Sequence, residues 1–280
     1  MSGEVERSGT AEFIYGTAWK EEQTEALTAM ALKSGFRGVD TANQRKHYVE
    51  EAVGNALSAA IDDGLVKREE VFLQTKFTYL AGQDDRLPYD RDAPVARQVE
   101  QSFSSSLQHL QTEYVDAYLL HGPSTRVGLA ETDRQVWEKM QQLLGSQKVG
   151  AIGISNVTAQ QLEILLDWAE VAPAYVQNRC FARSGWDRAV RRICTANGID
   201  YQGFSLLTAN IRELNSPAVQ EIATRHERTI PQVVFRFAMQ LGMIPLTGTT
   251  SREHMRQDLA CVEFSLDEAE METMERIAAG

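Results

Sequence analysis

Eight short apolar runs, each followed by a stretch with helical periodicity, recur along this chain of 280 residues. The predicted strands lie at residues 13–15, 36–39, 70–76, 115–120, 148–154, 174–176, 199–204 and 243–246. Alternating strands and helices predict a parallel sheet, and eight such units predict an α/β fold of the (β/α)8 type, the TIM barrel. No linker or change of composition interrupts the series, so we expect one domain over residues 1–280.

A doubly wound open sheet is the alternative arrangement for strands and helices that alternate. Such a sheet usually carries a glycine-rich phosphate turn, GxGxxG, after its first strand. The chain contains no such motif. The barrel is therefore favoured.

The charge balance and the cysteines narrow the class of protein. A formal net charge of -11 argues against nucleic acid or an acidic membrane surface as partner. No apolar run approaches the roughly 20 residues needed to span a bilayer, and the first residues lack the apolar core of a signal peptide. Cys180, Cys194 and Cys261 are widely spaced and odd in number, which indicates reduced, buried thiols. We expect a cytoplasmic protein without a metal site.

Polar and aromatic residues follow the predicted strands at the ends where a barrel holds its chemistry. A single aspartate after a strand is most often a helix cap. Here Asp40, Lys76 and His121 end three consecutive strands, so they would be neighbours on one rim. This grouping indicates an active site.

Five motifs in sequence order resemble the aldo-keto reductases: GFRGVDTA (35–42), FLQTKF (72–77), YLLHGP (118–123), GISN (153–156) and the strand containing Gln177. The resemblance runs from about residue 15 to 259. It implies a (β/α)8 oxidoreductase that reduces an aldehyde or ketone to an alcohol by hydride transfer from NAD(P)H. A small-molecule carbonyl compound would be the substrate, and the protein would be a monomer.

The resemblance implies a catalytic tetrad of Asp40, Tyr48, Lys76 and His121. Tyrosine can give the carbonyl oxygen its proton, but its ordinary pKa near ~10 is high for transfer at neutral pH. We expect the Lys76 ammonium to lower that pKa and Asp40 to compensate the lysine. Neutral His121 would donate a hydrogen bond to the carbonyl oxygen and orient the substrate.

The position of the tyrosine departs from the usual family spacing. The common spacing of five residues after the aspartate selects Arg45, and counting back from Gly54 selects His47. Tyr48 is favoured because an imidazole would not suit a pair with Lys76. Packing at the start of a helix is the alternative role for Tyr48.

The resemblance also implies a cofactor site for NADPH, with NADH as the alternative. Ser155, Asn156 and Gln177 would contact the carboxamide, and Phe204 would stack on the nicotinamide. The remaining expected contacts are Gly16 and Thr17 near the ribose, Ser205, Leu207, Thr247 and Gly248 along the diphosphate, and Arg252, Gln257 and Asp258 around the adenosine, and Asp40 is also expected to contact the cofactor. Leu246 and His254 stand where the family usually has the lysine and arginine that hold the 2′-phosphate. Arg252 either replaces them or is an ordinary solvated residue.

The chain stops soon after its last predicted helix, where many relatives continue into a tail that covers the substrate. We therefore expect an open substrate pocket walled by Trp19, Phe77, Tyr79, His121 and the loop 80–94. Two other functions remain as alternatives. One is a nucleotide-binding barrel with a regulatory or redox-sensing role and little turnover. The other is an unrelated barrel enzyme that forms a Schiff base through Lys76.

Overall fold

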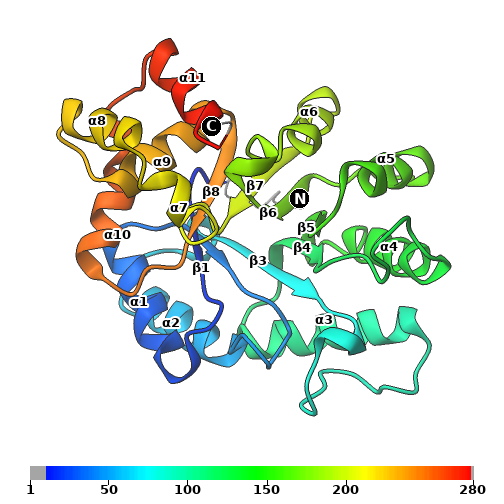
Figure 1. The fold of residues 1–280 in the computed structure, drawn as a ribbon. Coiled ribbons are helices and arrows are strands. Elements are labelled where there is room, and N and C mark those ends of the chain that lie inside the picture. The colour runs from blue at the N-terminus through cyan, green and yellow to red at the C-terminus, as the bar shows by residue number, and fades with distance from the viewer. Residues whose placement is uncertain (1–10, 279–280) are drawn as a thin grey trace, which may run out of the picture.

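A computed structural model describes residues 11–278 of the chain. Eight parallel strands form a closed barrel in which each strand pairs with its neighbours in the chain and β8 pairs with β1. The predicted (β/α)8 barrel is confirmed (Figure 1). The expectation of one domain over residues 1–280 extends beyond the described range. The strands are β1 (Ile14–Gly16), β2 (Gly38–Asp40), β3 (Phe72–Phe77), β4 (Val115–Leu120), β5 (Val149–Ser155), β6 (Tyr175–Arg179), β7 (Asp200–Phe204) and β8 (Met243–Thr247).

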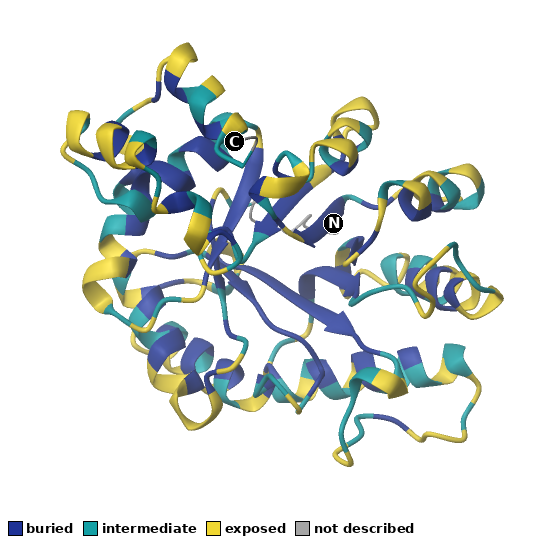
Figure 2. Cartoon of the chain, viewed as in Figure 1, coloured by how far each residue is buried: buried dark blue, intermediate teal, exposed yellow. Residues whose placement is uncertain are grey.

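Helices surround the barrel and cover its outer face. They are α1 (Thr24–Ser34), α2 (Glu50–Asp62), α3 (Val95–His109), α4 (Glu131–Leu144), α5 (Ala159–Trp168), α6 (Arg188–Ala196), α7 (Ile211–Leu214), α8 (Pro217–Arg225), α9 (Ile230–Gln240), α10 (Arg252–Leu259) and α11 (Glu268–Arg276). The strands are almost wholly buried, whereas every helix except α9 has exposed residues on its outer side (Figure 2). A parallel strand that is buried on both faces has a nearly continuous apolar sequence. For this reason the strands could be predicted from the sequence. No helix among residues 11–278 is long and apolar enough to cross a membrane.

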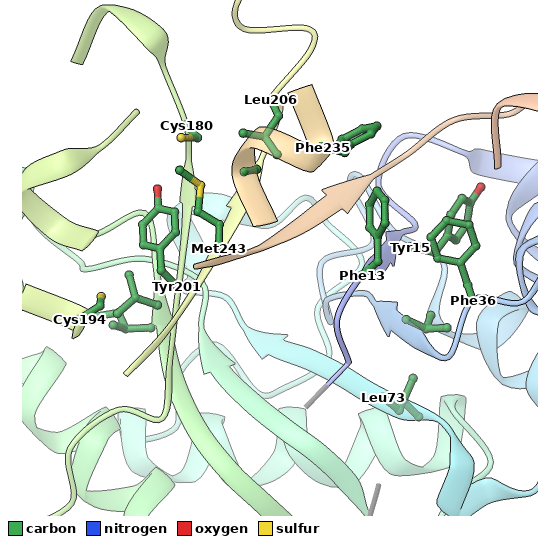
Figure 3. Packing of buried hydrophobic residues seen from close by; sticks show 14 of the residues in the cluster. Phe13, Tyr15, Phe36, Leu73, Cys180, Cys194, Tyr201, Leu206, Phe235 and Met243 are labelled. Carbon is green, nitrogen blue, oxygen red and sulfur yellow. The ribbon is translucent and has the colours of Figure 1, made fainter. Parts of the chain in front are cut away.

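Alternation along each strand divides the buried side chains into two sets. Ile14, Phe72 and Leu119 point into the barrel and form part of a small apolar cluster there. Phe13, Tyr15 and their equivalents point outward, into the large core beneath the helices. Figure 3 shows this outer core, in which Phe13 contacts Phe36 and Phe235 with ring centroids 5.5 and 4.9 Å apart. The three cysteines are buried and unpaired, as expected.

The last helix begins later than one signal in its sequence indicates. The pattern at Ser265 and Glu268 predicts a capping box, but the box is formed by Asp267 and Glu270. The physical reason is Leu266, which is buried and donates its backbone N–H to Gln240 Oε1. This contact holds the chain extended and delays the first helical turn to Glu268.

Gly54 lets α2 and α3 approach closely. A Cβ added at Gly54 would overlap the carbonyl oxygen of His109 and lie 2.9 Å from Leu110 Cα. Backbone atoms cannot rotate away as a flexible side chain can. The glycine therefore fixes the distance between the two helices.

We predict that Gly54→Ala lowers the free energy of unfolding by about 1–3 kcal/mol, because the helices must separate to admit the methyl group. The measurement is denaturant unfolding followed by circular dichroism. Gly145→Ala is the matched control. Gly145 is already in the right-handed helical region, and the nearest atom to its added Cβ is 3.5 Å away, so this change should stabilise the protein by about 0.4–1 kcal/mol. Equal effects of the two changes would contradict the close approach at Gly54.

Candidate active site

A cavity of about 1030 Å³ opens at the C-terminal ends of the strands, and this volume is ample for a cofactor and a small substrate. Most residues singled out in the sequence contribute to its wall. Those that line it are Gly16, Trp19, Asp40, Tyr48, His121, Ser155, Asn156, Gln177, Phe204, Ser205, Leu207, Leu246, Thr247, Gly248, His254, Gln257 and Asp258.

A buried ion pair lies beneath the cavity. Lys76 is fully buried and donates to Asp40 Oδ1 at 2.5 Å and to the carbonyl of Thr41 at 2.8 Å. Its place on β3 follows from alternation, since Phe72 and Gln74 occupy inward positions below it. Burial lowers the pKa of Lys76, and the Asp40 carboxylate opposes that shift.

Amide side chains from three strands complete the surroundings of Asp40. Gln74 Nε2 and Gln177 Nε2 donate to Asp40 Oδ1 at 2.6 and 3.0 Å. Both amides also donate to Gln202 Oε1, at 2.9 Å each. Their hydrogen bonds hold the carboxylate and separate the polar cavity from the apolar cluster inside the barrel.

Tyr48, in the loop between β2 and α2, lies next to the ion pair of Asp40 and Lys76. Its ring lies edge-on to His121, with centroids 5.9 Å apart, and the Lys76 ammonium is 5.5 Å from its centroid. His47 instead stacks on Trp19 at the cavity wall, with centroids 3.7 Å apart. The structure thus brings Tyr48, rather than Arg45 or His47, to Lys76 and His121.

The expected direction of the Tyr48 pKa shift is wrong. Burial raises the pKa of Tyr48 above its ordinary value, and the negative charge of Asp40 raises it further. Lys76 does not reverse this shift because Asp40 already neutralises its charge at 2.5 Å. The phenol therefore keeps its proton at neutral pH.

A second contact fixes the Tyr48 loop from outside the barrel. Glu50, the first residue of α2, is buried and accepts from the Thr75 hydroxyl at 2.5 Å. Its other carboxylate oxygen lies 3.1 Å from His109 Nδ1. Because Thr75 adjoins Lys76 on β3, Glu50 ties the tyrosine loop to the lysine strand.

His121 follows the end of β4 and is held by its Nδ1, which lies 2.7 Å from the Thr78 hydroxyl. Burial and the charge of Lys76 lower the pKa of His121 to about 3, so the ring is neutral near pH 7. When the Thr78 hydroxyl donates to Nδ1, the ring proton is on Nε2 and free to meet a carbonyl oxygen. The predicted neutral imidazole agrees with this environment.

The polar residues at the end of β5 and within β6 form one bonded group. Asn156 Nδ2 donates to the His121 carbonyl at 2.8 Å and to Ser155 Oγ at 3.1 Å. Ser155 Oγ donates to the Gln177 carbonyl at 2.7 Å. Phe204, at the end of β7, borders the same part of the cavity. Amide groups beside an aromatic ring suit a flat ring that bears a carboxamide.

The opposite end of the cavity lies between β8 and α10. Leu246, His254, Gln257 and Asp258 line it, and Asp258 accepts from the Thr247 hydroxyl at 2.8 Å. Burial raises the pKa of Asp258 to about 6. Arg252 is exposed at the start of α10 and does not line the cavity, so its contact with a cofactor stays a prediction.

Four expectations differ from the structure. Phe77 faces outward, because inward positions on β3 alternate with it, and it packs on Tyr79 and Tyr89. Tyr79 donates to Asp133 Oδ1 at 2.8 Å, away from the cavity. No residue of the loop 80–94 lines the cavity, so Phe77, Tyr79 and that loop are not its walls. Thr17 lies below the wall and donates to the Asp40 carbonyl at 2.9 Å.

Sequence reasoning missed two cations of the cavity wall. Lys20 follows Trp19 directly and donates to the Gly248 carbonyl at 2.5 Å. Arg179 ends β6 two residues after Gln177. A period of two counted onward from Gln177 would have indicated Arg179, whereas Lys20 gave no periodic signal.

Comparison with known proteins agrees with this geometry. A model of the Aldo/keto reductase family matches residues 8–279. The D-galacturonate reductase of Fragaria ananassa is 31% identical over 91% of this chain and 82% of its own. The glyoxal reductase of Bacillus subtilis (strain 168) is 27% identical over 91% and 83%. An aldo-keto reductase enzyme from a Medee basin deep-sea metagenome library shares the fold, with a TM-score of 0.83, 23% identity and coverage of 99% and 96%.

We predict that Asp40→Asn lowers the free energy of unfolding by about 3–5 kcal/mol, because the Lys76 ammonium would stay buried without its counter-charge. Urea unfolding measures the change. The matched control is Glu100→Gln, which removes an exposed ion pair with Arg97 and should cost less than about 1 kcal/mol. A cost for Asp40→Asn no larger than that of the control would show that Lys76 does not need the carboxylate.

Proposed function

The chain belongs to the aldo/keto reductase family, and we propose that Tyr48, Lys76, Asp40 and His121 carry out the reduction of an aldehyde or ketone in its cavity. Membership makes the protein an NAD(P)H-dependent oxidoreductase. The observation that carries the proposal is the meeting of a protonated phenol, a neutral imidazole and a buried ammonium at one end of the cavity.

The cavity extends from Phe204 to α10 and could hold a dinucleotide along that length. Phe204, Asn156 and Gln177 would hold the nicotinamide end, close to His121. The buried Lys20 ammonium lies on the wall near Gly248, within reach of a diphosphate, and has no carboxylate within 4.0 Å among residues 11–278. Bound NAD(P)H supplies the hydride that reaches the carbonyl carbon.

Tyr48 gives the proton that completes the alcohol. The phenol is protonated at neutral pH, as a proton donor must be, although its raised pKa opposes release of the proton. As the phenol gives up its proton, the Lys76 ammonium, 5.5 Å from the ring centroid, favours the phenolate that remains. His121 Nε2–H would hold the carbonyl oxygen and stabilise the charge that develops on it.

The structure bears on the other two functions. A Schiff base requires an accessible, uncharged lysine, whereas Lys76 is fully buried and bonded to Asp40 and Thr41. This argues against a lyase. A regulatory barrel would not need Tyr48 and His121 beside the ion pair, so turnover decides between that role and reduction. The names of the relatives, D-galacturonate reductase and glyoxal reductase, support small polar carbonyl compounds as substrates.

We predict that Tyr48→Phe lowers kcat by about 10²–10⁴-fold, because the proton donor is removed while the ring is kept. The measurement is the oxidation of NADPH with a generic aldehyde, together with a thermal melt. His47→Gln is the matched variant, since His47 lies one residue away on the same cavity wall, and it should cost less than about tenfold. A larger loss from His47→Gln than from Tyr48→Phe would assign the proton to the imidazole.

We propose that NADPH and NADH both serve as cofactor, with little discrimination. The cavity end at α10 offers His254 and the Asp258 carboxylate, and neither Lys nor Arg of α10 lines the cavity. A 2′-phosphate placed there would lack a firm cationic contact.

We predict dissociation constants for NADPH and NADH within about tenfold of each other, and about tenfold tighter binding of NADPH alone in His254→Arg. Titration followed by tryptophan fluorescence measures both. Arg252→Gln is the control and should change neither constant, because Arg252 lies outside the cavity wall. A selective loss of NADPH binding in Arg252→Gln would restore its expected role.

A further inference from the structure

Arg179 places a charged group on the cavity wall that the proposed chemistry does not use. It is the last residue of β6 and is exposed. Side chains alternate along a strand: Gln177 points inward to Asp40, while Asn178 points outward to the Val157 carbonyl and Asp187. Arg179 therefore leaves the strand on the same side as Gln177, about 6–7 Å further along the strand. Its place in the cavity wall agrees with this direction.

The guanidinium of Arg179 has no ionic partner. Among residues 11–278, no carboxylate lies within 4.0 Å of it and no acceptor receives its hydrogen bonds. Its one marked contact is with the Phe204 ring, 5.6 Å from the guanidinium carbon to the ring centroid. The two residues are paired across β6 and β7. Its donors are therefore available to a ligand.

The other charges of the cavity are neutralised or lie toward the proposed cofactor. Lys76 and Asp40 neutralise each other, Lys20 lies beside Gly248 where we place the diphosphate, and Asp258 lies at the far end beside Thr247. The chain as a whole carries a net charge of -11, so its average field repels an anion. A local cation at the mouth is then what would admit an anionic substrate.

We propose that Arg179 binds the carboxylate of the carbonyl substrate, and that the preferred substrates are aldehydes or ketones that carry such a group. The planar guanidinium matches a carboxylate with two parallel hydrogen bonds. Phe204, which we place beneath the nicotinamide, adjoins the guanidinium, so the anchored substrate stays near the reacting end. The inference rests on the proposed reductase function and adds its substrate class.

The test compares two aldehydes of nearly equal size, 4-carboxybenzaldehyde and 4-formylbenzamide, which differ in charge. The wild-type protein should have the higher kcat/KM for the carboxylate. In Arg179→Gln, the ratio of kcat/KM for the carboxylate to that for the amide should fall about 10- to 100-fold, chiefly through a higher KM. Added salt should raise the wild-type KM for the carboxylate and leave that for the amide almost unchanged.

Arg183→Gln is the matched control. Arg183 is an exposed arginine in the next turn of chain, with its guanidinium 4.5 Å from the Phe181 ring centroid, and it does not line the cavity. The ratio should stay at the wild-type value in this variant.

Two results would overturn the inference while leaving the reductase function intact. In one, Arg179→Gln lowers kcat/KM for both aldehydes equally and weakens binding of NADPH, which would assign Arg179 to the cofactor. In the other, the ratio does not change. Absence of NADPH and NADH oxidation with either aldehyde in the wild type would instead contradict the reductase function itself, and the inference with it.

Discussion

The ion pair between Asp40 and Lys76 is the interaction on which the arrangement of the site depends. Two charges buried inside a barrel are tolerated only where they meet each other and further polar groups. The barrel supplies those groups at one height: Gln74 from β3, Gln177 from β6 and Gln202 from β7. Four strands thus contribute to one bonded layer, and a shift of any of them would leave a buried polar group without a partner.

The charges of Lys76 and Asp40 also affect the pKa values of two residues that line the cavity, His121 and Tyr48. Burial and the charge of Lys76 keep His121 neutral, while burial and Asp40 raise the pKa of Tyr48, which stays protonated at neutral pH. Both are the donor forms that carbonyl reduction requires. Burial is the main cause of both states, and the two charges of the buried pair add to it.

Much of the architecture could be predicted because its signals are local. Apolar runs of strand length and the residues just beyond them located β2, β3 and β4, and with them Asp40, Lys76 and His121. The wrong prediction that Phe77 lines the pocket could have been avoided. Side chains alternate along a strand, so the neighbour of the inward Lys76 must face outward. The pKa of Tyr48 could not be predicted, because its sign depends on burial and on how closely Asp40 neutralises Lys76. The cavity-lining residues of α10 could not be predicted, because the length of the loop after β8 decides which of them reach the cavity, and here they are His254, Gln257 and Asp258.

The contact of Glu50 with Thr75 has a consequence for how such a site can change over generations. It joins the loop of Tyr48 to the strand of Lys76 on the side of the barrel that faces the helices. The spacing between the Tyr48 phenol and the Lys76 ammonium is therefore set by residues that lie outside the cavity wall. Residues of the rim, such as Trp19 and Arg179, are then free to be replaced one at a time, so that one chemistry can be offered to differently shaped and charged molecules.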